Sequence, residues 1–197
     1  MTVFSGFTSK TPESLLLDSG AFLRDYDPAT DTWETAKATK LIGATQGGGS
    51  FSAVPTVRRI EIDGVKGAAK GLEAVDEWVV TLTANVKEVK PEVIAMALAS
   101  SKTEDSETPA DYHKITANNE IAMDDYIDSI AWVGRLSGSD KPVIIVIKNA
   151  LCTNGLTLTM QDKSEGVVAL TFTAHYDPED LQAPPFEIYY PKAGGAA

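Results

Sequence analysis

The chain has 197 residues, and 28 Asp and Glu against 17 Lys and Arg give it a formal net charge of −11. Its length favours one domain with a sizeable core, and 43% apolar with 23% charged residues is typical of globular rather than disordered proteins. The negative charge disfavours ordinary DNA or RNA binding, and the single cysteine, Cys152, excludes an intrachain disulfide.

Alternation of apolar and polar residues predicts a mainly β chain. The alternation is longest in Trp78–Lys87 and Val167–Tyr176, where every second residue is apolar. In chain order the predicted strands are Leu15–Arg24, Leu41–Thr45, Val57–Asp63, Trp78–Lys87, Ile127–Leu136, Val143–Ala150, Leu156–Gln161, Val167–Tyr176 and Phe186–Tyr190. Nine strands in one domain favour a two-sheet antiparallel β-sandwich.

One segment, Pro91–Ser100, predicts a flanking α-helix. Pro91 suits the first helical position, and apolar residues four apart form a stripe that must pack on a sheet. The polar stretch Asp27–Glu34 and the acidic stretch Lys102–Asp111 are predicted to be surface loops. No stretch approaches the roughly 20 apolar residues of a membrane span, so we expect no membrane partner.

Charge is distributed unevenly along the chain. Residues 37–72 hold six basic and two acidic residues, a net charge of +4, whereas residues 101–128 hold two basic and eight acidic residues, a net charge of −6. These opposite charges can pair within one molecule or match one copy to the next in a head-to-tail contact.

Sequence motifs of catalysis and ligand binding are absent. The Gly43–Gly49 run lacks the Lys-Ser/Thr of a phosphate-binding loop, and neither His113 nor His175 has a second ligand at metal-binding spacing. Cys152 is predicted to be a small core residue rather than a catalytic thiol. We therefore expect no enzymatic activity, no cofactor and no metal ion.

Several segments, in the same order, resemble the major tail tube proteins of long-tailed bacteriophages. They are Leu17-Asp-Ser-Gly-Ala-Phe22, Leu41-Ile-Gly-Ala-Thr-Gln-Gly-Gly-Gly-Ser-Phe-Ser52, Arg59-Ile-Glu-Ile-Asp-Gly-Val-Lys-Gly67 with Lys70-Gly-Leu72, the Trp78 strand, and Ala174-His-Tyr-Asp-Pro-Glu-Asp180 with Pro184-Pro-Phe-Glu-Ile188. The resemblance covers most of the chain, although residues 101–140 match nothing in that family.

The resemblance implies a structural virion protein without catalytic residues. In that family a single tail tube domain, here residues 1–197, forms hexameric rings that stack into a tube, with a continuous β-barrel around a negatively charged channel. The expected partners are further copies of the chain, a tape measure protein, and tail terminator or tail tip proteins. Genomic DNA would pass through without specific binding. The expected location is the virion tail, assembled in the host cytoplasm.

By position, three regions are expected to reach neighbouring subunits: an N-terminal arm (1–14), an extended loop region (43–71) and a C-terminal arm (177–197). Within the loop region we expect Gly47–Val54 to be dispensable for folding, because it is polar and glycine-rich. The expected inter-subunit and stacking residues are Gly47, Gly48, Gly49, Ser50, Phe51, Arg58, Arg59, Lys66 and Lys70.

Two features of the residues themselves agree with assembly. Joining the open sheet edges of neighbouring copies around a ring would remove their unpaired backbone groups. The alternate, outward residues Thr81, Thr83, Thr171 and Thr173 would suit a wetted channel wall.

An alternative is a carbohydrate- or protein-binding β-sandwich module. In that hypothesis Trp33, which is hard to bury in a polar loop, and surface tyrosines would form the binding groove.

Overall fold

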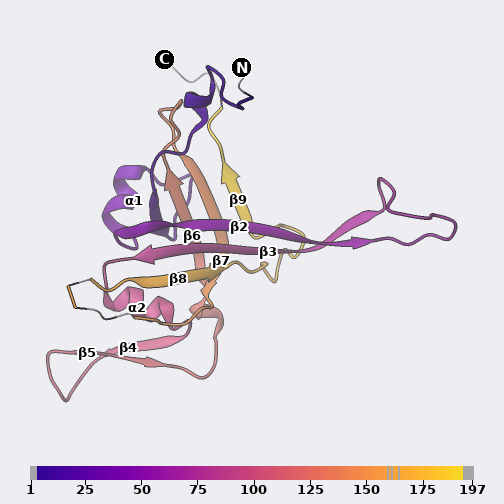
Figure 1. Cartoon of the computed structure of the whole chain (residues 1–197). Helices are drawn as coiled ribbons and strands as arrows, with labels where there is room; N and C mark the ends of the chain where they lie inside the picture. The colour runs from indigo at the N-terminus through magenta and orange to yellow at the C-terminus, as the bar shows by residue number, and fades with distance from the viewer. Residues whose placement is uncertain (1–3, 159, 161, 164, 193–197) are drawn as a thin grey trace.

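The computed structural model describes residues 4–158, 160, 162–163 and 165–192, and it is mainly β (Figure 1). Within these residues there are two α-helices, nine strands and two short 3-10 turns, at Thr11–Ser14 and Met123–Asp125. In chain order the elements are β1 (Ala21–Arg24), α1 (Trp33–Thr39), β2 (Thr45–Arg59), β3 (Glu73–Val86), α2 (Pro91–Ala97), β4 (Ser101–Asp105), β5 (His113–Ala117), β6 (Ile127–Gly134), β7 (Val143–Cys152), β8 (Val168–Thr173) and β9 (Phe186–Tyr189).

Seven strands form one antiparallel sheet in the order β1-β6-β7-β8-β3-β2, with β9 paired to β7. The sheet changes layer at β7. Most of this strand pairs with β6 and β9, whereas its last residues, Leu151 and Cys152, pair with β8. The β6–β7–β9 strands and the β2–β3–β8 strands therefore form two layers whose directions cross (Figure 1), consistent with the predicted sandwich.

The main core lies between these layers. Val80, Leu82, Ala84 and Val86 of β3 are buried, as their alternation predicts. They lie beside the apolar residues of β8 and pack in one cluster with those of β6 and β7. Helix α2 closes one end of the core with Val93 and Ala97. A smaller cluster packs α1 on the opposite face of β1, β6 and β7.

Most predicted elements are confirmed, but several strands differ in extent. The predicted strand Trp78–Lys87 begins five residues earlier, at Glu73 in β3, and Val167–Tyr176 is shorter, as β8. Leu15–Arg24 is a strand only from Ala21, because Leu16 makes an isolated bridge to Leu136. Leu41–Thr45 is likewise an isolated bridge followed by the first residue of β2. Val57–Asp63 combines the end of β2 with a turn. In Leu156–Gln161 only Leu158 bridges another strand, and residues 159 and 161 lie outside the described residues.

Two predicted loops contain regular structure. Trp33 and Glu34 begin α1, whose N-cap Thr32 accepts a hydrogen bond from the Thr35 backbone N–H. The capping pair starts this helix without the apolar stripe that marks α2. Residues 102–105 belong to β4, which pairs with β5 in a separate two-stranded sheet.

The two terminal regions differ in how they attach to the fold. The N-terminal segment is exposed in residues 4–10 and has no regular structure before the 3-10 turn. The C-terminal region is not a free arm throughout, because β9 pairs with β7 from Phe186↔Ile147 to Tyr189↔Ile144. No helix in the described part of the chain has the length and apolar character needed to span a membrane.

Candidate functional site

The most prominent feature of the molecule is a projecting β-hairpin. Strand β3 pairs with β8 only over Thr81–Val86, so no third strand of the described chain pairs with the outer half of the β2–β3 pair. We call residues 54–79 the arm. In Figure 1 it extends far beyond the two layers. Its strands pair from Val54↔Val79 to Arg59↔Glu73, and the tip is the turn region 60–72. The predicted loop region 43–71 is therefore a strand over most of its length.

The arm exposes an unusual number of large apolar side chains. Seven of them are between 38% and 55% exposed: Val54, Val57, Ile60, Ile62, Val65, Val75 and Val79. Val54 lies opposite Val79, and Val57 lies opposite Val75, so two apolar pairs follow each other along the ribbon. In a two-stranded hairpin such pairs have no further layer to pack against.

The glycine run lies on the body of the protein, not in a loop. Gly47 and Gly48 form an irregularity in β2. Thr45 pairs with Val86 and Gly49 pairs with Ala84, so four residues of β2 advance along two residues of β3. Gly48 has a φ of 65°, which favours glycine. A Cβ on Gly49 would lie 1.9 Å from the Thr83 carbonyl oxygen and 2.7 Å from Phe22 Cζ. These glycines are required by the fold of one chain.

Ser50 and Phe51 are also held within the chain. The Ser50 hydroxyl hydrogen-bonds to Thr83 Oγ1 at 2.8 Å. Phe51 packs against the main core, with its ring centroid 5.9 Å from that of Phe186. The expectation that Gly47–Val54 is dispensable for folding is therefore wrong, because the segment pairs with the buried half of β3 and covers the core.

The four expected basic residues lie together on the arm. Arg58 Nε is 2.9 Å from Asp76 Oδ1, and the Arg59 guanidinium donates a hydrogen bond to the Gly67 carbonyl oxygen. Lys66 and Lys70 are exposed at the tip. Five acidic residues accompany them, so the whole arm has a net charge of −1; these are Glu61, Asp63, Glu73, Asp76 and Glu77.

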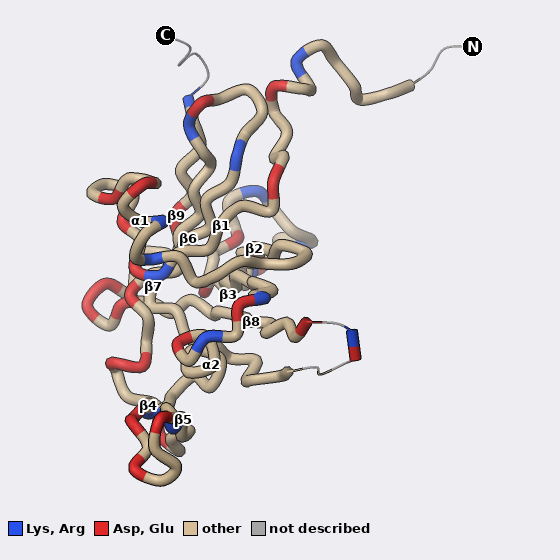
Figure 2. Tube along the Cα trace, turned by 90° about the vertical axis from the view of Figure 1, so that its left-hand side faces the viewer, with Lys and Arg blue, Asp and Glu red and all other residues tan. Residues whose placement is uncertain are grey.

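The basic segment of the sequence thus does not form one basic patch. Lys37 and Lys40 lie on and just after α1, away from the arm, and Lys40 Nζ is 2.6 Å from Asp31 Oδ2. The acidic segment is partly neutralised as well, since Glu104 pairs with Lys102 at 2.7 Å on the β4–β5 hairpin. Figure 2 shows acidic residues concentrated on this hairpin. Pairing within the molecule accounts for part of the charge pattern.

Strand β2 leaves one long sheet edge open. Among the described residues it pairs only with β3. Pro55, which has no N–H to donate, is tolerated in a strand of this kind because prolines are confined to edges and bulges. The opposite edge near β8 is covered by its own chain, since Asn154 Nδ2 donates to the Ala169 carbonyl oxygen at 2.7 Å and Asn154 Oδ1 accepts from the Thr171 N–H at 2.9 Å.

The outer face of β2, β3 and β8 carries hydroxyl groups and no charge over two successive rows. Ser50 lies opposite Thr83, which lies opposite Thr171. The next row joins Ser52, Thr81 and Thr173 in the same way. These residues face away from the core, because their neighbours on each strand are the core residues.

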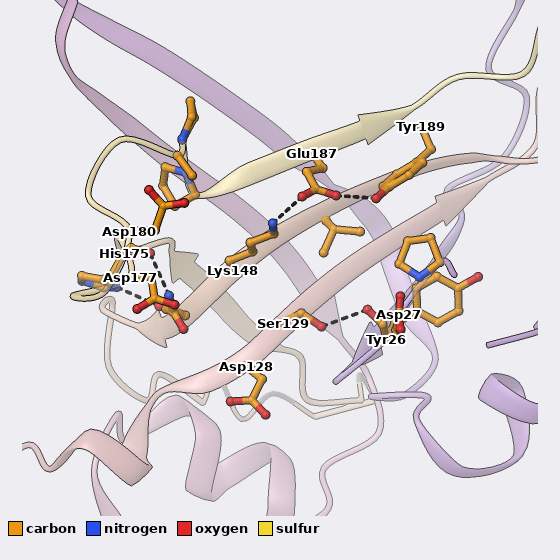
Figure 3. A pocket seen from close by; sticks show the side chains of 16 residues that line it. Tyr26, Asp27, Asp128, Ser129, Lys148, His175, Asp177, Asp180, Glu187 and Tyr189 are labelled. Carbon is orange, nitrogen blue, oxygen red and sulfur yellow. Dashed lines mark hydrogen bonds and ion pairs between the residues drawn. The ribbon is translucent and has the colours of Figure 1, made fainter. Parts of the chain in front are cut away.

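A polar cavity of about 490 Å³ opens on the other layer, among β6, β7, β9 and the loops beside them (Figure 3). Lys148 pairs with Glu187, and the Tyr189 hydroxyl donates to the same carboxylate. The Lys148 ammonium, aided by Tyr189, lowers the pKa of Glu187. The bond to this carboxylate raises the pKa of Tyr189.

Three other titratable groups that line this cavity, His175, Asp27 and Asp177, make contacts within their own surroundings. His175 Nδ1 is 3.0 Å from the Asn149 carbonyl oxygen, and its ring meets Tyr126 edge-on with centroids 5.1 Å apart. Asp27 and Asp177 accept hydrogen bonds from backbone N–H groups of their own loops. These contacts assign His175 and both aspartates to local structure.

Metal and thiol chemistry find no support in the described part of the chain. No group of three or more His, Cys, Asp and Glu side chains there is arranged to hold a metal ion. Cys152 is a buried core residue, as predicted, and burial raises the pKa of its thiol.

Comparison with known proteins adds no identification. No protein-family model matches the chain, and no curated protein sequence matches it either.

Sequence reasoning missed the apolar surface of the arm. Its valines and isoleucines are separated by Pro55, paired acids and glycines, a composition that indicates loops. The recurrence of β-branched residues from Val54 to Ile62 gave only the predicted strand Val57–Asp63, although it could have extended that strand back to Val54.

Proposed function

We propose that the protein is a structural subunit whose copies assemble through the arm and the open edge of β2. The assembly would be a tube of stacked hexameric rings, as in the major tail tube proteins that the sequence resembles. The observation that carries this proposal is the arm, because its seven half-exposed apolar side chains have no covering layer in one chain.

Solvation argues for a protein partner on the arm. A two-stranded hairpin in water is marginally stable, and removing apolar surface from water contributes about 25 cal/mol per Å². Covering both apolar pairs, Val54 with Val79 and Val57 with Val75, would therefore stabilise the arm and the contact together. A net arm charge of −1 makes apolar packing, rather than charge attraction, the main contribution.

The open edge of β2 favours a second copy as that partner. A strand of 15 residues with one open edge is a liability for a protein in water, and closing sheets around a ring removes it. In the proposed ring the β2, β3 and β8 strands of neighbouring copies would form a continuous β-barrel.

The hydroxyl rows of β2, β3 and β8 support a role as a channel wall. Tight binding of nucleic acid requires Lys or Arg against phosphates, and these rows contain neither. Glu77 pairs with Thr56 and lies on the same outer face of the sheet as the hydroxyl rows. It brings negative charge to the border of that face. Under this proposal genomic DNA passes through the tube without specific binding, and the other partners are tape measure, terminator and tip proteins of a virion tail.

Shortening the arm tests the proposal. In one variant, residues 57–76 are replaced by Asn-Gly, which can join the paired residues Thr56 and Glu77 in a two-residue hairpin. The core residues are untouched, so we expect a folded protein that remains a monomer in sedimentation velocity at concentrations where the native chain forms large particles. Unchanged assembly of this variant would contradict the proposed role of the arm.

A subtler variant separates apolar packing from the shape of the arm. Replacing Val57, Ile60, Ile62 and Val75 with Thr keeps β-branched side chains but adds hydroxyl groups. We expect weaker assembly, with a higher critical concentration. The matched control is Val89→Thr with Ile121→Thr, since both residues are exposed but lie off the arm. An equal effect of the control would indicate general solubility instead of a specific contact.

A further inference from the structure

A second cavity, of about 510 Å³, lies between the start of α1, the start of β1, the end of β6 and the loop that precedes β7. We call it the Trp33 groove, after its aromatic wall. Its floor is formed by Ala21 and Val133, which lie opposite each other in the β1–β6 pair. The rim includes Asp18, Arg135, Asp140 and Lys141. Pockets of 300–1,000 Å³ with few polar groups around an apolar surface are typical of small-molecule sites.

Backbone pairing holds the rim in place. Leu17 N–H donates to the Arg135 carbonyl oxygen at 3.2 Å, and Ser137 N–H donates to the Leu15 carbonyl oxygen at 2.9 Å. The Trp132 indole Nε1 donates to the Ser19 carbonyl oxygen at 2.8 Å. The segments that carry Asp18 and Arg135 are therefore fixed to each other before any ligand arrives.

Trp33 forms an aromatic wall that the fold leaves uncovered. It is the first residue of α1, directly after the N-cap Thr32. The residue of α1 that packs in the cluster beneath the helix is Ala36. The Trp33 side chain is 42% exposed while lining the groove. A large aromatic surface held open beside polar groups suits a ligand that has both an apolar face and polar edges.

The charges of the groove are balanced. Two carboxylates and two cations line it, and in the part of the chain that the structure describes none of them is in an ion pair. Balanced charge gives no net attraction to an anion or a cation. It does supply hydrogen-bond donors on Arg135 and Lys141 and acceptors on Asp18 and Asp140.

We propose that the Trp33 groove binds a neutral pyranoside sugar. The C–H face of the ring would stack on Trp33, and its hydroxyl groups would bond to the carboxylates and cations of the rim. The site uses no residue of the arm, and α1 lies at the opposite side of the molecule from the tip of the arm (Figure 1).

Saturation-transfer difference NMR tests the site on monomers or assembled particles alike. The probes are the methyl glycosides of glucose, galactose, mannose and N-acetylglucosamine, all neutral. We expect saturable transfer to at least one of them, with a Kd on the order of 1 mM for so open a site. In Trp33→Ala we expect affinity to fall about tenfold or more, a loss of at least about 1.4 kcal/mol.

Two further variants make the result specific. Asp140→Asn keeps the size of the side chain but removes its charge, and we expect it to weaken binding of the same glycoside. Tyr112→Ala removes an exposed aromatic residue that does not line the groove, and it should bind like the native chain. The melting temperature is measured for each variant, so that unfolding is recognised. Absence of transfer to all four glycosides, or undiminished binding by a folded Trp33→Ala, would overturn the proposal.

Discussion

Strand β3 passes through two environments, and its halves show how the body and the arm differ. From Val80 to Val86 every second residue is buried in the core, and β2 and β8 flank the strand. From Glu73 to Val79 the same strand pairs with no described strand except β2, and Val75 and Val79 are about half exposed. Backbone pairing alone thus extends a hairpin well past the core, but it leaves apolar surface in water.

The comparison indicates a division of labour. Burial of β-branched and aromatic side chains stabilises the body, whereas the arm adds little to the stability of one chain and offers its surface to a neighbour. Under the proposed function, the apolar surface that the arm exposes in one copy is buried in the assembly, and this burial stabilises the assembled state.

The largest expected effect comes from truncating the core. Phe172 on β8 is 0% exposed, so Phe172→Ala should lower the free energy of unfolding by about 3–5 kcal/mol. Val75→Ala on the arm should change it by less than about 0.5 kcal/mol, because the side chain has no covering layer. Urea unfolding at a concentration that keeps the protein monomeric compares the two. Similar losses would show that the arm is part of the cooperative core.

An intermediate effect is expected where β2 crosses the body. Gly49→Ala would force a Cβ against the Thr83 carbonyl and Phe22, and we expect a loss of roughly 1–3 kcal/mol. Gly67→Ala at the tip is the control, since a Cβ there meets nothing within 4 Å. It should be neutral or slightly stabilising. Equal thermal shifts for both substitutions would contradict the tight crossing.

The comparison also explains what the sequence could predict. Burial on one face leaves alternation, so β3 and β8 are recognisable. Strands β6 and β7 are buried on both faces and are recognisable as apolar, β-branched runs. The spacing of Val93 and Ala97 identifies α2. Helix α1 buries only Ala36, and β4–β5 has no buried residue, so neither leaves an apolar pattern. Their formation depends on a capping pair and on strand pairing across a turn.

The candidate sites depended even more on tertiary structure. Trp33 is conspicuous in the sequence, but its partners Asp18, Arg135 and Asp140 come from distant segments that meet only through the β1–β6 pairing. The glycines of β2 indicated a flexible loop, whereas Gly49 is fixed by close approach to Thr83. Local composition gives no information on where two strands approach each other so closely.

The smallest expected effect concerns the polar surface of the body. Lys148 lowers the pKa of Glu187, so the ion pair contributes stability above the unfolded-state pKa of about 4.3 and loses it as the pH falls through the folded-state value. Both side chains are over 40% exposed, so Glu187→Gln should cost only about 0.2–1 kcal/mol at neutral pH.

Urea unfolding of the native chain and Glu187→Gln across the acid range checks this sign. The difference between them should shrink as the pH falls, and Lys148→Met should show the same trend. A difference that stays constant with pH would mean that Glu187 acts through packing instead of charge.

Electron microscopy of the concentrated native protein tests the central claim most directly. If copies assemble through the arm and the edge of β2, negatively stained fields should contain rings or hollow tubes, and the variant with residues 57–76 replaced should show only small single particles. Native protein that stays as single particles at high concentration, even with tail initiation components supplied, would contradict the account.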